Sequence, residues 1–300
     1  MNIIQRLWQK YSPDFLLDFI RFILEPRDYK TRRKAVLEKF RKLDQDKLVP
    51  EIREGLRYLK NHKYTPFPYN WAHKYDRVLP EVFYDKENRI FYILFEGKKM
   101  YFPRSFSMTH VIWNVRRLLK EQDMQSPHLY LNDGFLVEPG SVVIDAGVAE
   151  GNFALSVIDE AQRVYLVECD KEWMEALKLT FDPWKDKVVF IEKYMSDIES
   201  ETTICLDSLM IPEPGFSYFI KLDIEGFEQK ALSGMKRMVI SGDQIKMDVC
   251  TYHRLNDYNE IEATLLAYGF TCRGSDGFVL YSETGEEPTF RKALIRAEKK

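Results

Sequence analysis

Cysteine is scarce in this chain, and its few cysteines are not spaced for disulfides or for metal binding. The 300 residues contain four cysteines, no two of which form a C-x-x-C pair. Three of the four lie in apolar, strand-like runs, where a thiol is more often buried and reduced than reactive. We therefore expect reduced thiols and a cytoplasmic protein. The four are Cys169, Cys205, Cys250 and Cys272.

Long apolar runs are also missing. The most apolar N-terminal stretch, residues 15–24, is interrupted by Asp18 and Arg21 and is too short to span a bilayer. Neither the apolar core nor the small-residue cleavage site of a signal peptide precedes it. Repeats and low-complexity tracts are absent, whereas 45% of the residues are hydrophobic and 14% aromatic. This composition predicts a globular protein with an ample core and no transmembrane segment.

The chain as a whole carries no excess of positive charge. It has 44 Lys and Arg residues against 47 Asp and Glu residues, a formal net charge of −3, and its calculated pI is near 6.1. This balance, with the lack of an Asn/Asp-Pro-Pro-Tyr motif, argues against a nucleic-acid partner. Residues 1–60 differ, since 15 basic and 9 acidic side chains give them a charge of +6. We interpret them as a solvated helix surface; contact with an anionic membrane or an acidic glycan is the alternative.

The hydrophobic pattern divides the chain at residues 125 and 284. Helical spacing dominates residues 1–62, and residues 81–102 predict a small antiparallel meander. From residue 128 onward, short apolar runs alternate with amphipathic segments, which predicts a mostly parallel sheet with helices on both faces. We expect the last two strands to form a hairpin at the sheet edge, and residues 285–300 to form a basic tail, either a short helix or a frayed end. The predicted strands are 142–146, 164–168, 188–191, 218–222, 245–250, 270–272 and 278–281, and the predicted helices are 151–160, 172–180, 226–239 and 257–268.

The most informative segment is residues 142–154, which read VVIDAGVAEGNFA. A buried strand ends at Asp145, small residues follow at Gly147, Ala149 and Gly151, and an amphipathic segment begins. Such a turn lets the backbone approach a ligand closely, and the following helix N-terminus offers free N–H groups. By itself this pattern is shared by nicotinamide, flavin and S-adenosyl-L-methionine (SAM) folds.

The segments downstream distinguish these folds. The next strand ends in Glu168, 17 residues after Gly151, where a carboxylate can accept hydrogen bonds from a ribose diol. The glycine spacing is G-x-A-x-G, unlike the dinucleotide fingerprint G-x-G-x-x-G. Further on, residues 221–228 read KLDIEGFE, the pattern K-x-D-x-E-G-x-E. Through these motifs, residues 128–282 resemble the FkbM-type SAM-dependent methyltransferases. The resemblance implies a Rossmann-like class I methyltransferase fold, with a seven-stranded sheet and one reversed strand, preceded here by the helical and small antiparallel N-terminal region.

The resemblance also implies the parts of a cofactor site. The small residues of the turn would accommodate the methionine part of SAM, Glu168 would hold the ribose, and Asp197 would recognise adenine. A carboxylate at Asp223 could bind the cationic amino group of SAM. Asp170 could serve instead as a helix cap. The expected cofactor-binding residues are Asp145, Gly147, Ala149, Gly151, Glu168, Asp197 and Asp223.

Residues after the strand ends are candidates for the acceptor side. His253 is the preferred general base, because imidazole near neutral pH can take a hydroxyl proton; a structural histidine is the alternative. Asp223 is the second candidate catalytic residue. A divalent metal on Asp223, Glu225 and Asp248 or His253 is conceivable, yet we favour no metal, since acids after a strand often stabilise a helix N-terminus. The expected substrate-binding residues are His128, Tyr130, Glu225 and Glu228.

We expect the chain to be a SAM-dependent methyltransferase that methylates a hydroxyl of a sugar, a glycan intermediate or another small metabolite. The aromatic stretch of residues 64–75 could stack on sugar faces or could form interdomain core. A non-catalytic SAM-binding regulatory or scaffold protein is the alternative, and a nucleic-acid methyltransferase is a weaker one. A homo-oligomer is compatible with the sequence.

Overall fold

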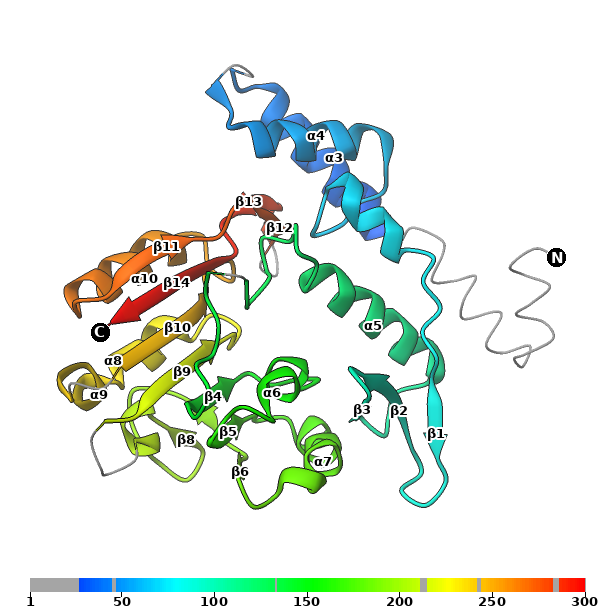
Figure 1. The fold of residues 1–300 in the computed structure, drawn as a ribbon. Helices are drawn as coiled ribbons and strands as arrows, with labels where there is room; N and C mark the ends of the chain where they lie inside the picture. Colours follow the sequence, from blue (N-terminus) through cyan, green and yellow to red (C-terminus); the bar gives the residue numbers. More distant parts are fainter. Residues whose placement is uncertain are drawn as a thin grey trace.

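The computed structural model describes residues 27–44, 47–132, 134–210, 215–241, 244–282 and 286–299. The predicted helices before residue 27 lie outside this range. The chain has two parts, an N-terminal region and an α/β sandwich (Figure 1). The N-terminal region contains helices α3 (Arg27–Arg41) and α4 (Pro50–Asn61), the 3₁₀ helix η2 (Asn70–Tyr75), strands β1 (Phe83–Asp85), β2 (Ile90–Phe95) and β3 (Lys98–Tyr101), and helix α5 (Met108–Glu121).

The sandwich is built around a seven-stranded sheet with the order β11-β14-β10-β9-β4-β5-β6. Strands β6, β5, β4, β9 and β10 pair in parallel, and β14 is antiparallel to both of its neighbours. A seven-stranded sheet with one reversed strand is the class I methyltransferase fold that the sequence predicted. The strands are β4 (Val142–Ala146), β5 (Arg163–Val167), β6 (Val188–Ile191), β9 (Ser217–Leu222), β10 (Gln244–Cys250), β11 (Thr271–Gly274) and β14 (Leu294–Lys299).

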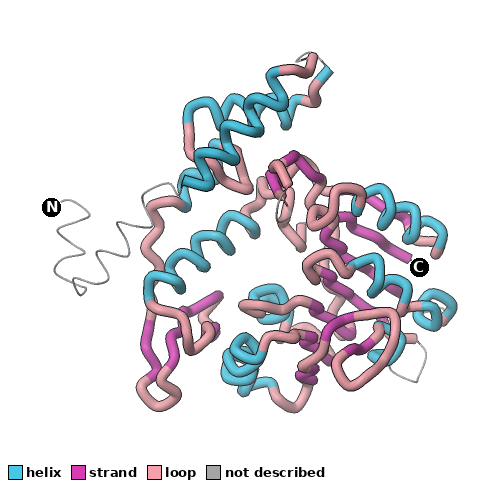
Figure 2. The backbone as a smooth tube through the Cα atoms, turned by 180° about the vertical axis from the view of Figure 1, so that it is seen from behind, coloured by secondary structure: helices cyan, strands magenta, loops and turns pink. Residues whose placement is uncertain are grey.

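Helices cover both faces of this sheet, as seen from behind in Figure 2. Neighbouring residues of a strand point to opposite faces, so each strand contributes to two cores. Val143 and Phe219 belong to the core formed with α5, α6 (Asn152–Val157) and α7 (Lys171–Thr180), whereas Ile144 and Ile220 belong to the core formed with α8 (Glu228–Ser233), α9 (Lys236–Ile240) and α10 (Asp257–Ala267).

The predicted helix 226–239 is interrupted at Gly234. A Cβ there would lie 2.6 Å from the Ser196 carbonyl oxygen, so the chain passes too close for a side chain and the helix divides into α8 and α9. The short elements that remain are the 3₁₀ helices η3 (Asp182–Trp184) and η4 (Leu206–Leu209) and the paired strands β7 (Tyr194–Met195) and β8 (Thr203–Ile204).

The C-terminal part differs from the prediction in two ways. Residues 294–299 are neither helical nor frayed: they form β14, which lies between β10 and β11. The predicted edge hairpin is also wrong, because β11 pairs with β14, whereas β12 (Val279–Tyr281) pairs with β13 (Thr289–Arg291) outside the sheet. The buried strand was not predicted because its sequence contains basic residues such as Arg296. In the structure, Arg296 lies 3.7 Å from Asp248 on β10, and this carboxylate compensates its charge.

The N-terminal region shares its packing with the sandwich. The predicted meander β1–β3 is confirmed, and α3 and α4 pack against the β12–β13 hairpin through Val36, Leu59 and Phe290. The apolar face of α5 belongs to the core of the sheet, although α5 precedes the predicted boundary at residue 125. The aromatic stretch 64–75 is largely buried core as well, with Phe67 and Tyr69 fully enclosed. The division at residue 125 stays a prediction about independent folding. No helix among the described residues is long and apolar enough to cross a membrane.

Candidate functional site

The small-residue turn follows β4 and is shaped by its packing. Gly147 has φ +72°, and a Cβ there would lie 1.7 Å from the Asp223 carbonyl oxygen at the end of β9. Ala149 also adopts a left-handed conformation, with φ +44°. Gly151 faces away from the cavity described below, because a Cβ there would lie 2.8 Å from Leu177. Gly147 and Ala149 line that cavity, whereas Gly151 is small so that α6 can pack on α7.

Glu168 stands at the end of β5 and joins two loops. One carboxylate oxygen accepts a hydrogen bond from the Ala149 N–H at 3.1 Å, and the other accepts one from the Asp170 N–H at 2.8 Å. Asp170 in turn caps α7, accepting hydrogen bonds from the N–H groups of Glu172 and Trp173. The carboxylate of Glu168 is therefore held at the cavity wall by the turn and by the start of α7.

Asp145 and Lys221 form a buried ion pair beneath the turn. The Lys221 Nζ lies 2.8 Å from Asp145 Oδ1 and donates a second hydrogen bond, also of 2.8 Å, to the Gly147 carbonyl. Burial opposes the ammonium charge, but the carboxylates of Asp145 and Asp223 raise the pKa of Lys221. Asp145 is thus a support of the turn and does not line the cavity. Sequence reasoning missed Lys221, although it is the first residue of K-x-D-x-E-G-x-E.

Asp223 follows β9 and is surrounded by hydrogen-bond donors. Tyr130 donates to Oδ2 at 2.8 Å, and Tyr252 donates to Oδ1 at 3.3 Å. Burial opposes its charge, but His253, His128 and Lys221 together hold the pKa of this carboxyl well below its usual range. Asp223 is therefore an anion throughout the neutral pH range, and with Tyr130 it faces the cavity.

His253 lies behind Asp223 and does not line the cavity. Its Nδ1 is 2.9 Å from Glu228 Oε1, which also accepts hydrogen bonds from the N–H groups of Ile224 and Gly226. Although burial opposes the imidazolium, the Glu228 hydrogen bond and the charge of Asp223 raise the pKa of His253 to about 9. This environment favours the imidazolium over the free base, which disfavours the general-base role expected of His253. Glu228, expected to contact the substrate, is 1% exposed and does not line the cavity.

Two further predicted residues lie outside the cavity. His128 is buried, with Nε2 3.3 Å from the Tyr252 hydroxyl, and burial lowers its pKa to about 4. Asp197 accepts a hydrogen bond from Ser196 and lies 3.7 Å from Lys230, on the outer side of its loop. Residues just before Asp197, among them Met195, line the cavity in its place.

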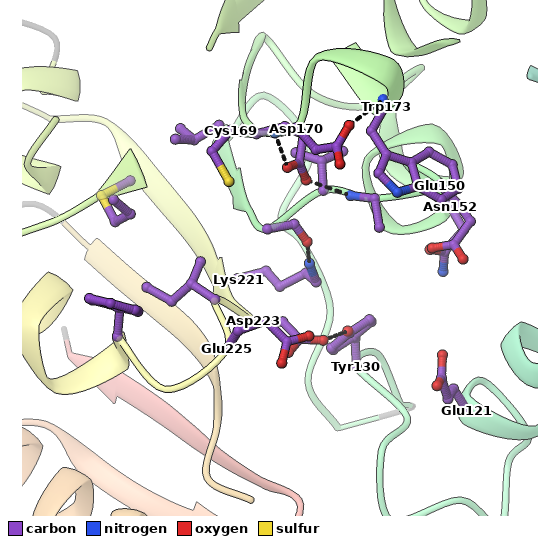
Figure 3. Close-up of a pocket in the computed structure, with 18 of the residues that line it drawn as sticks. Glu121, Tyr130, Glu150, Asn152, Cys169, Asp170, Trp173, Lys221, Asp223 and Glu225 are labelled. Atoms are coloured by element: carbon purple, nitrogen blue, oxygen red, sulfur yellow. Dashed lines mark hydrogen bonds between the residues drawn. The ribbon is translucent and has the colours of Figure 1, made fainter. Parts of the chain in front are cut away.

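The cavity itself has a volume of about 380 Å³ and opens where β4, β5 and β9 end (Figure 3). Most of its charged side chains are acidic. The carboxylates are Glu121, Glu150, Glu168, Asp170, Asp223 and Glu225, and the cationic side chains are Arg117, Lys193 and Lys221.

One wall of the cavity comes from α5. Arg117 lies 3.5 Å from Glu121 and 3.4 Å from Glu150, so one guanidinium bridges two carboxylates. Burial raises the pKa of both carboxyls, and Arg117 opposes that shift. In Figure 3, Glu121 lies on the side of the cavity that holds Tyr130 and Asp223. Sequence analysis did not single out Glu121, because a helix acid without a motif looks like a solvated surface residue.

Two groups of side chains around Asp223 have the spacing of metal ligands. One contains His128, Asp223 and Cys250, and the other contains Asp223, Glu228 and His253. Within each group the ligand atoms all lie within 4.8 Å of one another. Both groups include Asp223, so a cation at either one would border the cavity.

One family model matches the C-terminal part of the sandwich. Residues 182–272 match the model of the methyltransferase FkbM domain. This range begins at η3, contains β9 and the K-x-D-x-E-G-x-E motif, and ends in β11. A comparison with curated proteins gives no significant match.

Solved structures of methyltransferases are similar at low sequence identity. The methyltransferase FkbM from Methylobacillus flagellatus is 18% identical with a TM-score of 0.43, over 57% of this chain and 47% of that one. The precorrin-6y C5,15-methyltransferase from Geobacter metallireducens is 15% identical with a TM-score of 0.38, over 55% and 81% of the two chains. An rRNA methylase from Streptococcus thermophilus is 14% identical with a TM-score of 0.34, over 54% and 89%.

The chain spans about half the length of the Methylobacillus protein. With the family match over residues 182–272 and the seven-stranded sheet with one reversed strand, the resemblance seen in the sequence is confirmed. Residues 182–272 thus match the methyltransferase FkbM domain, within a sheet of the class I methyltransferase type.

Proposed function

We propose that this protein is a SAM-dependent methyltransferase whose acceptor is a hydroxyl group. The observation that carries the proposal is the acidic cavity of about 380 Å³ at the carboxyl ends of β4, β5 and β9. Ligands of open α/β sheets bind at this edge. The cavity also has the size of a small-molecule site, for which roughly 300–1,000 Å³ is usual.

The charges of the cavity fit SAM. SAM carries a sulfonium and an ammonium group against one carboxylate, and six carboxylates against three cationic side chains line the cavity. Glu168 would hold the ribose hydroxyls, since its carboxylate is fixed at the wall by two backbone N–H groups. Gly147 and Ala149 would border the methionine part, and Asp223 would attract a cationic group of the cofactor. When bound, SAM supplies an electrophilic methyl group, and the protein aligns the acceptor with it.

The acceptor side is rich in hydrogen-bond acceptors. Glu121 and Glu225 line the cavity with carboxylate oxygens. Phe227 lines the rim and is 46% exposed, so one ring face is available for stacking. Carboxylates and an exposed ring are groups that recognise polyhydroxylated molecules. A sugar hydroxyl, free or within a glycan, is therefore the acceptor that we propose.

The acidic cavity disfavours a nucleic-acid acceptor, because phosphates would meet carboxylates at its mouth. His253 is poorly placed to take the hydroxyl proton, because its two ring nitrogens face the carboxylates of Glu228 and Asp223. In place of a base, we regard His253 as a residue that positions the loop after β9.

Calorimetry with SAM and with S-adenosylhomocysteine (SAH) tests the cofactor assignment. We expect the wild type to bind both ligands, and Glu168→Ala to lose at least about 2 kcal/mol of binding free energy, because hydrogen bonds to a charged group are lost. Glu192→Ala is the matched control: it removes a carboxylate after the neighbouring strand β6, outside the cavity. Wild-type protein that binds neither ligand would contradict the proposal.

A second measurement separates an enzyme from a scaffold. Purified protein is incubated with SAM and with extracts of sugars and glycans, and the SAH formed is measured by mass spectrometry. An enzyme produces SAH with one of these fractions. Tight SAM binding without SAH in any fraction would favour a regulatory or scaffold protein.

A further inference from the structure

Three side chains converge where β9 and β10 end. His253 Nε2 lies 3.3 Å from Asp223 Oδ1 and 3.7 Å from Glu225 Oε2. Asp223 and Glu225 both line the cavity, and His253 closes the group from behind. One ring nitrogen therefore faces two carboxylates at the wall of the cavity, and His253 and Asp223 also belong to a group with the spacing of metal ligands.

His253 Nε2 points into this group without a hydrogen bond. The residue is 3% exposed, and its Nε2 is a buried polar atom that lacks a hydrogen-bond partner among the described residues. Asp223 Oδ1 is near enough, at 3.3 Å, but not in the geometry of a hydrogen bond. A buried ring nitrogen that faces two carboxylate oxygens in this way is unsatisfied by the protein alone.

The other ring nitrogen is held as in metal-binding histidines. Nδ1 lies 2.9 Å from Glu228 Oε1, which the N–H groups of Ile224 and Gly226 fix in place. Histidines that ligate metals usually donate their second N–H to a carboxylate or a carbonyl, which orients the ring. Glu228 has this outer role toward His253 through Oε1, which faces three donors, the N–H groups of Ile224 and Gly226 and the His253 ring.

Glu225 is placed by a strained backbone. Its φ is +53°, a conformation that is unfavourable for a residue with a Cβ. Gly226 follows with φ +90°, and hydrogen bonds from the N–H groups of Ile224 and Gly226 to Glu228 hold the loop on either side of Glu225. As a result the Glu225 carboxylate stays beside His253 although its side chain is 82% exposed. Strain of this kind concentrates at functional sites.

We propose that Asp223, Glu225 and His253 bind a divalent cation of the first transition row, such as Mn²⁺, at the wall of the cavity. Two carboxylates balance the charge of the dication, which would take the place of the Nε2 proton and release that proton to water. One imidazole favours a transition metal over Mg²⁺ or Ca²⁺. The remaining coordination positions would open toward the cavity, from which the acceptor enters.

Of the two groups with the spacing of metal ligands, the one that contains His128, Asp223 and Cys250 suits a cation less well than the one that contains Asp223 and His253. His128 Nδ1 is buried without a hydrogen-bond partner among the described residues, so the outer carboxylate or carbonyl of a metal-binding histidine is missing. Tyr252 lies beside its Nε2 at 3.3 Å, within hydrogen-bonding distance of the nitrogen that would have to bind the metal.

The role of the cation rests on the proposed function. A hydroxyl oxygen that coordinates a metal releases its proton to water more readily, because the metal stabilises the oxyanion. The same coordination would orient the hydroxyl of the acceptor. The cation would thus do the work for which His253 is unsuited.

Metal binding is tested on chelator-treated full-length protein with MnCl₂. The loss of the free Mn²⁺ signal in electron paramagnetic resonance gives the stoichiometry and affinity, without any acceptor. We expect one Mn²⁺ per chain. We also expect at least about 10-fold weaker binding in Glu225→Gln and His253→Gln, since loss of even an outer-shell partner costs that much. Glu225 is exposed, so its variant should fold normally, and circular dichroism checks both. Glu192→Gln is the control for charge and should bind as the wild type does.

Two results would overturn the metal proposal: no stoichiometric Mn²⁺ binding by the wild type, or equal binding by the wild type and both ligand variants. Calorimetry with SAH in the presence of EDTA tests the cofactor assignment separately from the metal site. SAH binding without Mn²⁺ binding would refute the metal site alone. Mn²⁺ binding that both variants weaken, without SAH binding, would uphold the metal site and refute the cofactor.

Discussion

The buried pair of Asp145 and Lys221 allows a quantitative prediction. Replacing Lys221 with Met removes the ammonium group and keeps most of the side-chain volume. Asp145 is then left fully buried with its charge uncompensated, and the Gly147 carbonyl loses a hydrogen bond of 2.8 Å. Breaking a buried ion pair by removing one partner costs about 3–5 kcal/mol. We therefore expect Lys221→Met to lower the free energy of unfolding by that amount.

Two further variants test whether the loss of stability comes from the unpaired charge of Asp145. Lys246→Met carries the same substitution on the neighbouring strand β10, where Lys246 pairs with the half-exposed Glu138. A pair in contact with solvent contributes about 1 kcal/mol or less, so this control should be nearly neutral. In the double variant Asp145→Asn, Lys221→Met, the unpaired charge is removed, and most of the lost stability should return.

The assay is urea denaturation followed by tryptophan fluorescence, with and without saturating SAH. Additive losses in the double variant would show that the charges of Asp145 and Lys221 are not coupled, and would refute the account of the pair. The single variant should also bind SAH more weakly, because Lys221 supports the turn at Gly147. Unchanged SAH affinity in a destabilised Lys221→Met protein would separate the ion pair from the cofactor site.

Two other substitutions have outcomes that the structure specifies. Gly147→Ala should lower the free energy of unfolding by at least about 2 kcal/mol and abolish SAH binding, because the new Cβ would lie 1.7 Å from the Asp223 carbonyl oxygen. A thermal melt measures the stability and calorimetry measures SAH binding. Normal SAH binding by the variant would contradict this packing argument. Asp123→Asn should reduce acid sensitivity: hydrogen bonds from Lys74 and Tyr75 hold the pKa of Asp123 below its ordinary value against the effect of burial. A lowered pKa stabilises the fold above the unfolded value, about 3.9 for Asp, and that contribution is lost as pH falls through the folded value. Urea midpoints between pH 3 and pH 7 should therefore fall more steeply for the wild type than for the variant, and parallel curves would refute the assignment.

The strands of the sheet were largely predictable because their signal is local. Apolar runs end at Asp145, Glu168 and Asp223, and each of these residues lies within one position of the end of a strand in the structure. Strand β6 has the predicted bounds, 188–191. The turn after β4 could be located too, since only small residues fit a chain that passes within contact distance of β9. Local geometry of this kind depends on residues that are neighbours in the sequence.

Pairings between distant residues were not predictable. Arg296 looks like part of a basic tail until Asp248 on β10 is seen to compensate its charge. Arg117 and Glu121 look like the solvated side of a helix, and only the position of α5 over the strand ends turns them into a cavity wall. His253 looked like a base because an isolated imidazole titrates near neutral pH. Its protonation depends on Glu228 and Asp223, which come from another part of the chain.

The motif K-x-D-x-E-G-x-E explains how one short segment serves three purposes. Lys221 and Asp223 are alternate residues at the end of β9, so both point to the same side of the sheet, where one supports the turn and the other faces the cavity. The chain then leaves the strand through the left-handed pair Glu225 and Gly226, which turns Glu225 toward the cavity. Glu228 begins α8, and its carboxylate reaches back to the loop and to His253. The glycine of the motif has φ +90°, and a Cβ there would lie 3.1 Å from Arg254, so a larger residue would disturb the loop. The fixed spacing of the four charged residues is thus the spacing that brings a turn support, two cavity carboxylates and a histidine anchor to one edge of the sheet.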